Sequence, residues 1–232
     1  MKKFDLQGTG VALVTPFHKQ GNIDFTSLGR LIDHTIEGGV DYLVSLGTTS
    51  EYPTLSSQEQ LAVVEFTIEK VENRVPIVLG MGGNDTRSLV DKIRHTDLSS
   101  IAAILSVAPY YNKPNQKGLY AHYKAIAEAS NTPIILYNVP GRCGVNMTAE
   151  TTLQLANDFS NIIGIKEASG NMAQCMEILA NKPQGFTVVS GEDALVLPMI
   201  ALGAQGVISV AANAYPNIMS ELVTHSLKSN MK

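Results

Sequence analysis

The sequence predicts an α/β protein, a (β/α)₈ TIM barrel formed by a single domain that spans residues 1–232. Eight short apolar runs recur along the chain, and each is followed by a segment with helical spacing. The runs are almost continuously apolar, as expected for parallel strands that are covered by helices. A doubly wound open sheet is the alternative, but the first strand–helix turn lacks a Gly-x-Gly-x-x-Gly fingerprint.

The first half of the chain contains four of these strand–helix units. The expected strands are residues 8–17, 41–46, 76–80 and 102–108. The expected helices are residues 24–38, 56–68, 86–95 and 116–129. In the first helix Leu28, Ile32 and Ile36 recur at helical spacing, and the glycine pair at 38–39 predicts its end. Ser56 and Glu59 have the spacing of a capping box, which predicts the start of the second helix.

The second half repeats the same pattern four more times. The expected strands are residues 133–137, 162–166, 186–190 and 206–211. The expected helices are residues 148–157, 172–179, 194–202 and 216–227. No linker and no shift in composition separates the two halves, so we expect one domain.

Composition excludes several classes of protein. Hydrophobic residues make up 44% of the chain and charged residues 16%, enough for a large core. The net charge is −4 and no basic run exceeds Lys2-Lys3, so no nucleic-acid partner is expected. The two cysteines lack metal-site spacing, and the chain shows neither a signal peptide nor an apolar run of membrane-spanning length. We therefore expect a cytoplasmic protein with no membrane partner.

The segment 161–170 (Asn-Ile-Ile-Gly-Ile-Lys-Glu-Ala-Ser-Gly) is the most informative stretch. It predicts a buried strand with Lys166 near its end. Gly164 lies on the same side of that strand and could leave room beside the lysine. An ammonium held against apolar walls loses hydration, which lowers its pKa and favours the neutral amine that attacks a ketone. A solvated lysine that ends a strand is the alternative.

Other polar side chains fall at the carboxyl ends of the expected strands, where a barrel of this kind places its chemistry. They are Thr48, Thr49, Tyr111, Tyr137 and Arg142. Each has an ordinary structural explanation when taken alone. Together with Lys166 they predict one rim with an amine, phenols, hydroxyls and a guanidinium, which suits covalent catalysis on a keto acid.

Two rival chemistries are disfavoured. A metal-dependent hydrolase needs His, Asp or Glu ligands at strand ends, but most histidines here fall in expected helices or the loops before them. A phosphate site would sit after the seventh and eighth strands. There Glu192 and Asp193 follow Gly191, and two carboxylates would repel a phosphate.

At these residues the chain resembles the dihydrodipicolinate synthase family, within the N-acetylneuraminate lyase superfamily of class I aldolases. The most specific matches are residues 47–51, 109–112, 137–142, 164–168 and 206–210. Arg142, within Tyr-Asn-Val-Pro-Gly-Arg, favours this family over the sialate aldolases, which usually lack that arginine. Another pyruvate-dependent aldolase and a non-catalytic barrel remain alternatives.

The resemblance implies a reaction without cofactor or metal. Lys166 would form a Schiff base with pyruvate, and the resulting enamine would attack aspartate 4-semialdehyde to give 4-hydroxytetrahydrodipicolinate, on the route to lysine and diaminopimelate. Tyr137 would be the general acid and base, in a proton relay with Thr48 and Tyr111. Tyr111 would come from the neighbouring subunit of a homotetramer built as a dimer of dimers.

The resemblance also implies the binding groups. Thr48 and Thr49 would hold the pyruvate carboxylate, and Arg142 would hold the carboxylate of the second substrate. The backbone carbonyls of Gly191 and Ile208 would orient the lysine and the substrate.

Four departures from the family are expected to matter to different degrees. Ser50 replaces a common glycine, which we expect to be tolerated in a loop. Cys143 replaces a common threonine, and we expect it to be a buried, inert thiol, with a thiol at the site rim that reacts with alkylating agents as the alternative. The positions that match the lysine feedback site lack its histidines and glutamate, so weak or absent inhibition by lysine is expected. Those positions are Tyr52, Pro53, Ser57, Gln60, Asn84, Ser88 and Tyr110. The chain is also expected to lack most of the family's C-terminal helical extension.

Overall fold

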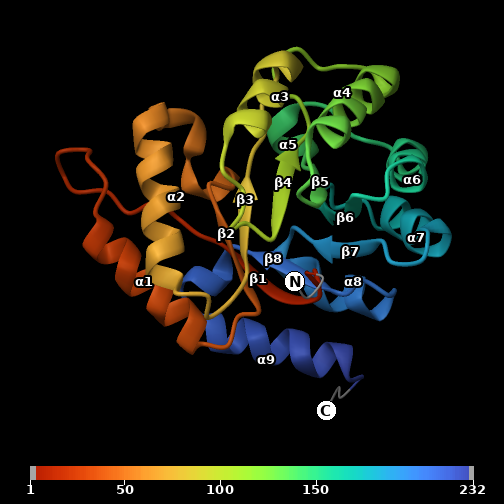
Figure 1. The fold of residues 1–232 in the computed structure, drawn as a ribbon. Helices are drawn as coiled ribbons and strands as arrows, with labels where there is room; N and C mark the ends of the chain where they lie inside the picture. Colours follow the sequence, from red (N-terminus) through yellow and green to blue (C-terminus); the bar gives the residue numbers. More distant parts are fainter. Residues whose placement is uncertain (1–3, 230–232) are drawn as a thin grey trace.

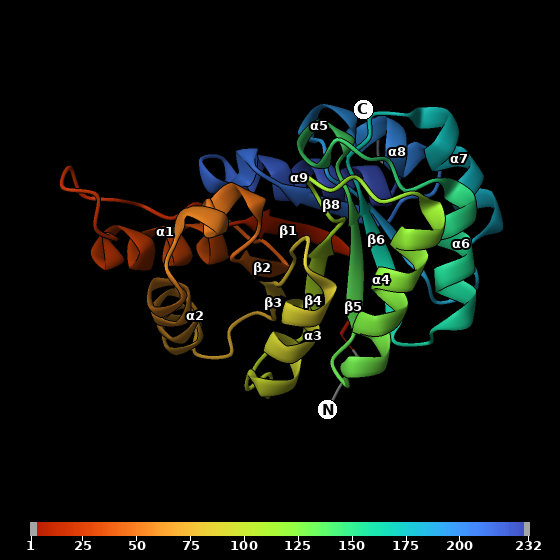
Figure 2. The same cartoon turned by 90° about the horizontal axis from the view of Figure 1, so that it is seen from above.

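Eight parallel strands close into a barrel in chain order from β1 to β8 in the computed structural model, which describes residues 4–229. Each strand pairs with the next, and β8 pairs with β1 to close the ring. The helices lie outside the strands, as Figure 1 shows and the view from above in Figure 2 repeats. The predicted (β/α)₈ barrel is therefore confirmed, and residues 1–3 and 230–232 of the predicted single domain lie outside the described residues.

The elements follow the predicted order. The strands are β1 (Gly8–Ala12), β2 (Tyr42–Ser45), β3 (Ile77–Gly80), β4 (Ala103–Val107), β5 (Ile134–Asn138), β6 (Ile162–Glu167), β7 (Thr187–Ser190) and β8 (Gly206–Ser209). The longer helices are α1 (Phe25–Glu37), α2 (Ser57–Val71), α3 (Thr86–His95), α4 (Gln116–Ala129), α6 (Ala149–Asp158), α7 (Met172–Asn181), α8 (Val196–Ala201) and α9 (Pro216–Leu227). The short elements are α5 (Pro140–Cys143) and the 3₁₀ turns η1 (Thr48–Ser50), η2 (Tyr52–Thr54), η3 (Asp193–Leu195) and η4 (Ala211–Asn213).

Capping residues set the helix ends where the sequence predicted them. Asp24 accepts a hydrogen bond from the backbone N–H of Ser27 at the start of α1, and Gly38 follows its last turn. Ser56 and Glu59 form the predicted capping box at the start of α2. These contacts satisfy donors and acceptors that a helix leaves unpaired at its ends.

Three local predictions needed correction. The first strand ends at Ala12 instead of residue 17, and Phe17 instead forms an isolated antiparallel bridge with Ile23. The helix expected at 194–202 divides into η3 and the shorter α8. The helix α5 was not predicted; it begins at Pro140, whose fixed φ suits a first helical position.

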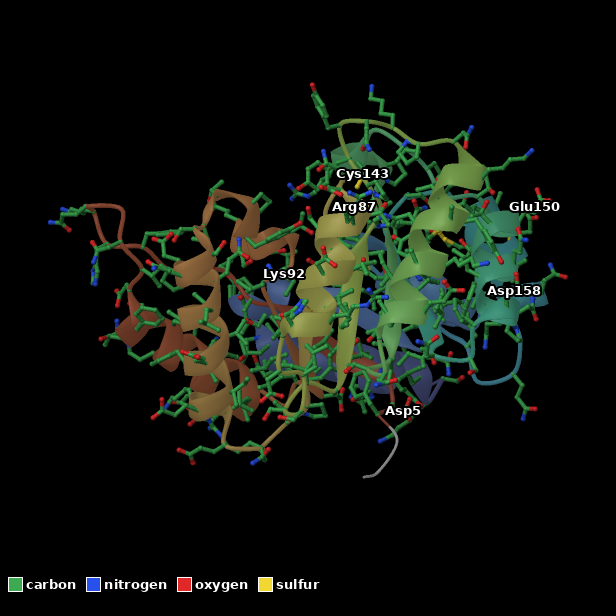
Figure 3. The ribbon with its side chains drawn as sticks, turned by 45° about the horizontal axis from the view of Figure 1, so that its top comes forward. Asp5, Arg87, Lys92, Cys143, Glu150 and Asp158 are labelled. Atoms are coloured by element: carbon green, nitrogen blue, oxygen red, sulfur yellow. The ribbon has the colours of Figure 1, made fainter. Side chains whose placement is uncertain are left out.

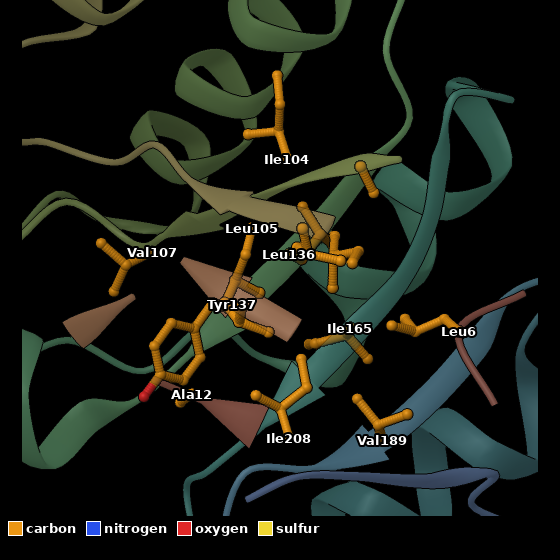
Figure 4. Packing of buried hydrophobic residues seen from close by; sticks show 14 of the residues in the cluster. Leu6, Ala12, Ile104, Leu105, Val107, Leu136, Tyr137, Ile165, Val189 and Ile208 are labelled. Atoms are coloured by element: carbon orange, nitrogen blue, oxygen red, sulfur yellow. The ribbon is translucent and has the colours of Figure 1, made fainter. Parts of the chain in front are cut away.

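The barrel interior is filled by side chains, and Figure 4 shows part of this packing with Tyr137 at one end. Leu6, just before β1, is 1% exposed and reaches the inner side of β6. A Cβ on Gly164 would come within 2.9 Å of Leu6 and 2.5 Å of the Thr187 carbonyl oxygen. The room that Gly164 leaves is therefore taken by Leu6 and β7, so it does not open a space beside Lys166.

Candidate active site

Lys166 lies near the carboxyl end of β6 and points into the barrel. It is only 3% exposed, and its strand neighbours in register are Tyr137 on β5 and Val189 on β7. Its Nζ lies 4.4 Å from the centre of the Tyr137 ring. The expected buried lysine on a strand is thus confirmed, and the solvated alternative is wrong.

Burial changes the acid–base chemistry of this amine. Loss of hydration lowers the pKa of Lys166 to about 8, although the Asp193 and Glu192 carboxylates oppose the shift and Arg142 adds to it. At neutral pH roughly a tenth of the molecules then carry a neutral amine, against about 3 in 10,000 for an ordinary lysine. The site therefore provides a nucleophile that a solvated lysine would not.

Gly191 gives the lysine side chain its space. A Cβ at this position would lie 3.0 Å from Lys166 Cε and 2.6 Å from the Ala168 Cβ. The Gly191 N–H donates to the Glu167 carbonyl oxygen at 2.8 Å, which holds the loop after β7 against β6. The position without a side chain that makes room for Lys166 is thus Gly191, in the loop after β7, and not Gly164.

Tyr137 presents its phenol in the same enclosed end of the barrel. Burial raises the pKa of Tyr137, while an interaction with the Thr48 hydroxyl and the charge of Arg142 both oppose that rise. The phenol therefore stays protonated at neutral pH and can donate a proton. Thr48 is the group beside it that can pass a proton onward.

The loop that carries Thr48 is held by hydroxyl groups. The Ser50 hydroxyl donates to the Gly47 carbonyl oxygen at 2.7 Å, and the Thr15 hydroxyl donates to the Ser50 carbonyl oxygen at 2.8 Å. Leu46 enters this loop with a positive φ of 53°, which is strained for a leucine. A Cβ on Gly80 would lie 2.1 Å from the Leu46 carbonyl oxygen, so this turn requires a glycine on β3.

Charged groups surround the mouth of the site. Arg142 lies on α5, exposed to solvent, and influences both Tyr137 and Lys166. Asp193 accepts hydrogen bonds from the backbone N–H groups of Val210 and Ala211, at 3.2 and 2.8 Å, and so ties the loop after β7 to the end of β8. Sequence reasoning gave Asp193 no role toward the lysine, although its place just after a barrel strand was a usable signal.

The remaining predicted residues occupy different places. Thr49 lies in η1 next to Thr48, and Ile208 is fully buried in β8, opposite Gly10. Tyr111 is 87% exposed, with a positive φ of 70°, on the loop after β4. The structure therefore brings Lys166, Tyr137 and Thr48 together but leaves the Tyr111 ring projecting from its own barrel.

Cys143 is the last residue of α5, directly after Arg142 in the sequence, and is labelled in Figure 3. Its thiol is 3% exposed, and burial raises the pKa of Cys143 to about 11. The expectation of a buried thiol is confirmed. Within residues 4–229, no three His, Cys, Asp or Glu side chains gather in a geometry that could hold a metal. None of the helices in this part of the chain is long and apolar enough to span a bilayer.

Comparisons with known proteins agree with this geometry. Residues 5–231 match the model of the dihydrodipicolinate synthetase family. A 4-hydroxy-tetrahydrodipicolinate synthase of Parabacteroides distasonis is 53% identical over 98% of this chain and 76% of its own length. The crystal structure of dihydrodipicolinate synthase from Aquifex aeolicus superposes with a TM-score of 0.93 at 41% identity, covering 97% of this chain and 76% of that one. A monomeric dihydrodipicolinate synthase variant also superposes with a TM-score of 0.93, at 39% identity over 97% of this chain and 75% of its own.

Proposed function

This chain belongs to the dihydrodipicolinate synthetase family, and from that premise we propose that Lys166 is its Schiff-base residue and Tyr137 its general acid and base. The chain is a lyase of the class I aldolase type. It condenses pyruvate with L-aspartate 4-semialdehyde to give 4-hydroxytetrahydrodipicolinate, in lysine and diaminopimelate biosynthesis. The burial of Lys166 against Tyr137 is the observation that carries the assignment of these residues.

The first half of the reaction uses the neutral amine of Lys166. Its Nζ adds to the keto carbon of pyruvate, and loss of water gives an imine on the lysine. Loss of a proton from the pyruvate methyl group then gives an enamine. Tyr137 supplies and removes the protons of these steps, and Thr48 passes them toward the mouth of the site.

The second half joins the two substrates. The enamine carbon attacks the aldehyde carbon, and the amino group of the second substrate then closes the ring and releases the Lys166 amine. Arg142 binds the carboxylate of the second substrate, because a planar guanidinium pairs well with a carboxylate and its charge already lies near the site. Thr48 and Thr49 hold the pyruvate carboxylate through hydroxyl and backbone donors, and the carbonyls of Gly191 and Ile208 orient the lysine and its adduct.

Tyr111 completes the relay in the site of a neighbouring subunit. Its ring is 87% exposed and projects from its own barrel, as a residue that acts in a partner would. The assembly we propose is a homotetramer built from two dimers, of which the dimer suffices for the relay. Because a monomeric variant also superposes with this chain, the oligomeric state needs its own measurement, for which sedimentation analysis is suited. The cytoplasmic location also stays a prediction.

Trapping with borohydride tests the assignment of Lys166. Reduction in the presence of pyruvate should fix one pyruvate on the chain, and peptide mapping should place it on Lys166. The Lys166→Ala variant should remain folded and unmodified. An adduct on another lysine would refute the assignment of Lys166. A folded parent chain with no adduct would refute the Schiff-base reaction and favour the non-catalytic barrel.

Arg142→Ala separates this function from that of another pyruvate-dependent aldolase. Removal of the guanidinium should raise the KM for L-aspartate 4-semialdehyde and leave the KM for pyruvate nearly unchanged. Unaltered turnover of the preferred aldehyde would instead support the alternative aldolase.

A further inference from the structure

A second polar cluster lies directly behind the proposed catalytic pair. Side chains on a strand alternate between its two faces, so Asn138 and Glu167, which follow Tyr137 and Lys166, point away from the barrel interior. The two are also in register, because Tyr137 pairs with Lys166 and Asn138 pairs with Glu167. Asn138 and Glu167 are thus each one residue away in the sequence from Tyr137 and Lys166, the proposed reacting pair.

Glu167 is a buried carboxylate held by amide donors. It is 1% exposed. It accepts hydrogen bonds from Asn138 Nδ2 at 3.2 and 3.0 Å, from the Ser169 backbone N–H at 2.7 Å and from Gln174 Nε2 at 3.1 Å. Burying an acidic group costs free energy unless such bonds are made, so its orientation is fixed by all four contacts.

Asn138 extends the cluster toward the segment that follows α5. It is fully buried, its Nδ2 also donates to Asn146 Oδ1 at 2.8 Å, and its Oδ1 accepts from the Met147 N–H at 3.0 Å. Gln174 on α7 accepts from Asn146 Nδ2 at 2.8 Å and donates to the Met147 carbonyl oxygen at 3.1 Å. The cluster therefore joins β5, β6, α7 and the chain just after Arg142.

We propose that Asn138 and Glu167 are positioning residues. They fix the position of β5 relative to β6, and with it the position of the Tyr137 phenol relative to Lys166 Nζ, and they anchor the segment after Arg142. The proposal rests on the proposed function, because it assigns the cluster to the geometry of that pair. The Tyr137 phenol must meet the imine at Lys166 Nζ, which now lies 4.4 Å from the ring centre. A misplacement of about 1 Å at such a contact lowers the rate by on the order of 100-fold.

Glu167→Gln is the primary test, because it keeps the size of the side chain and replaces one acceptor oxygen by a donor. That donor meets the donors of Asn138 and Gln174. We expect kcat per folded molecule to fall by on the order of 10- to 100-fold, while pyruvate still traps on Lys166 with a KM within about twofold of the parent value. In Glu167→Gln/Asn138→Asp the carboxylate and the amide exchange strands, and at least part of the lost kcat should return.

Asn161→Ala is the matched control for stability. Asn161 lies just before the opposite end of β6, where its Nδ2 donates to the Ala127 and Ser130 carbonyl oxygens at 2.9 and 3.0 Å. This variant should lower the Tm without lowering kcat per folded molecule. Gln174→Met replaces Glu167→Gln if the latter does not fold, and should lower kcat several-fold.

The outcomes separate the two proposals. Failure of the parent chain to trap pyruvate would refute the proposed function itself. Normal trapping on Lys166 together with a kcat within twofold of the parent in Glu167→Gln, or in Gln174→Met where that variant replaces it, would overturn the positioning role. A loss of kcat in Asn161→Ala equal to that in Glu167→Gln would also overturn it, because the effect would then follow stability alone.

Discussion

The two sides of the site hold their reactive groups in different ways. Lys166 and Tyr137 are side chains of neighbouring strands, paired in register and nearly excluded from solvent. Thr48 instead lies on a loop after β2 that begins at the strained Leu46, and two hydroxyl hydrogen bonds hold that loop. The proposed nucleophile and the proposed acid–base group, Tyr137, therefore both lie on paired strands, whereas Thr48, the next group of the proposed proton relay, lies on a loop that a few contacts hold.

Tyr137→Phe removes the phenol but keeps the ring beside the lysine. Because general acid–base catalysis contributes roughly 10²- to 10⁴-fold, we expect kcat to fall within that range while pyruvate still traps on Lys166. Steady-state turnover and intact-mass analysis measure the two effects.

Tyr123→Phe is the control for loss of a buried tyrosine hydroxyl. Tyr123 is fully buried on α4, and its hydroxyl donates to the Ser106 carbonyl oxygen at 3.0 Å. This variant should lose stability and keep its kcat. An equal loss of kcat in both variants would contradict the role of Tyr137.

Gly191→Ala tests the side of the site that holds Lys166, because it adds a methyl group next to the lysine side chain. The added methyl group would meet Lys166 Cε at 3.0 Å and the Ala168 Cβ at 2.6 Å, so either the lysine or the loop must move. We expect on the order of 100-fold slower imine formation, because displacement of the nucleophile is amplified in the rate. Gly170→Ala offers a contrast, since a Cβ there meets no atom within 4 Å, although its φ of +70° adds strain. Equal rates of trapping in Gly191→Ala and the parent would contradict the close fit.

Ser50→Ala tests the loop side. The lost hydrogen bond to the Gly47 carbonyl oxygen contributes about 0.5–1.5 kcal/mol, so kcat should fall by roughly 2- to 12-fold through Thr48. Ser45→Ala is the matched control, because the Ser45 hydroxyl is buried and has no hydrogen-bond partner among residues 4–229. Imine trapping should be unchanged in both variants. A Ser50→Ala enzyme with the kcat of the Ser45→Ala control would show that this hydroxyl does not position Thr48.

The smallest effect on turnover among these tests is expected from added L-lysine. Lys92 on α3, labelled in Figure 3, donates from Nζ to Gln60 Oε1 at 2.8 Å, and Gln60 Nε2 already bonds the Tyr52 and Leu55 carbonyl oxygens. A lysine molecule bound there would thus place its ammonium near that of Lys92, and the Gln60 amide would have its hydrogen-bonding groups already engaged. We expect weak or absent inhibition in a steady-state assay, and a micromolar inhibition constant would contradict this.

The periodicity of the sequence was sufficient to predict the barrel. The strands are so uniformly apolar, and the helix ends so clearly marked by Asp24, Gly38 and Ser56, that order and type followed directly. The helix α5 was missed because four residues are too few to show a helical period. Lys166 was predicted as a buried amine because an apolar strand surrounds it in sequence.

Contacts between distant segments could not be predicted in the same way. Gly164 was predicted to leave room beside Lys166, but Leu6, more than 150 residues earlier in the chain, fills that space. The glycine that makes room for the lysine side chain itself is Gly191. The serine at position 50 was predicted only to be tolerated, and its bond to Gly47 depends on a turn that the sequence does not specify. The Asn138–Glu167 contact was missed because each residue looks like an ordinary strand end.

The pH dependence of imine formation tests most directly the central claim, that burial lowers the pKa of Lys166 and so raises the share of the neutral, nucleophilic amine. The rate of borohydride trapping at subsaturating pyruvate should rise about tenfold per pH unit and level off near pH 8, because the pKa of Lys166 is about 8. Asp193→Asn should move the midpoint to lower pH, since the Asp193 carboxylate stabilises the ammonium form. A rate that continues to rise through pH 10, as for a solvated lysine, would contradict the account.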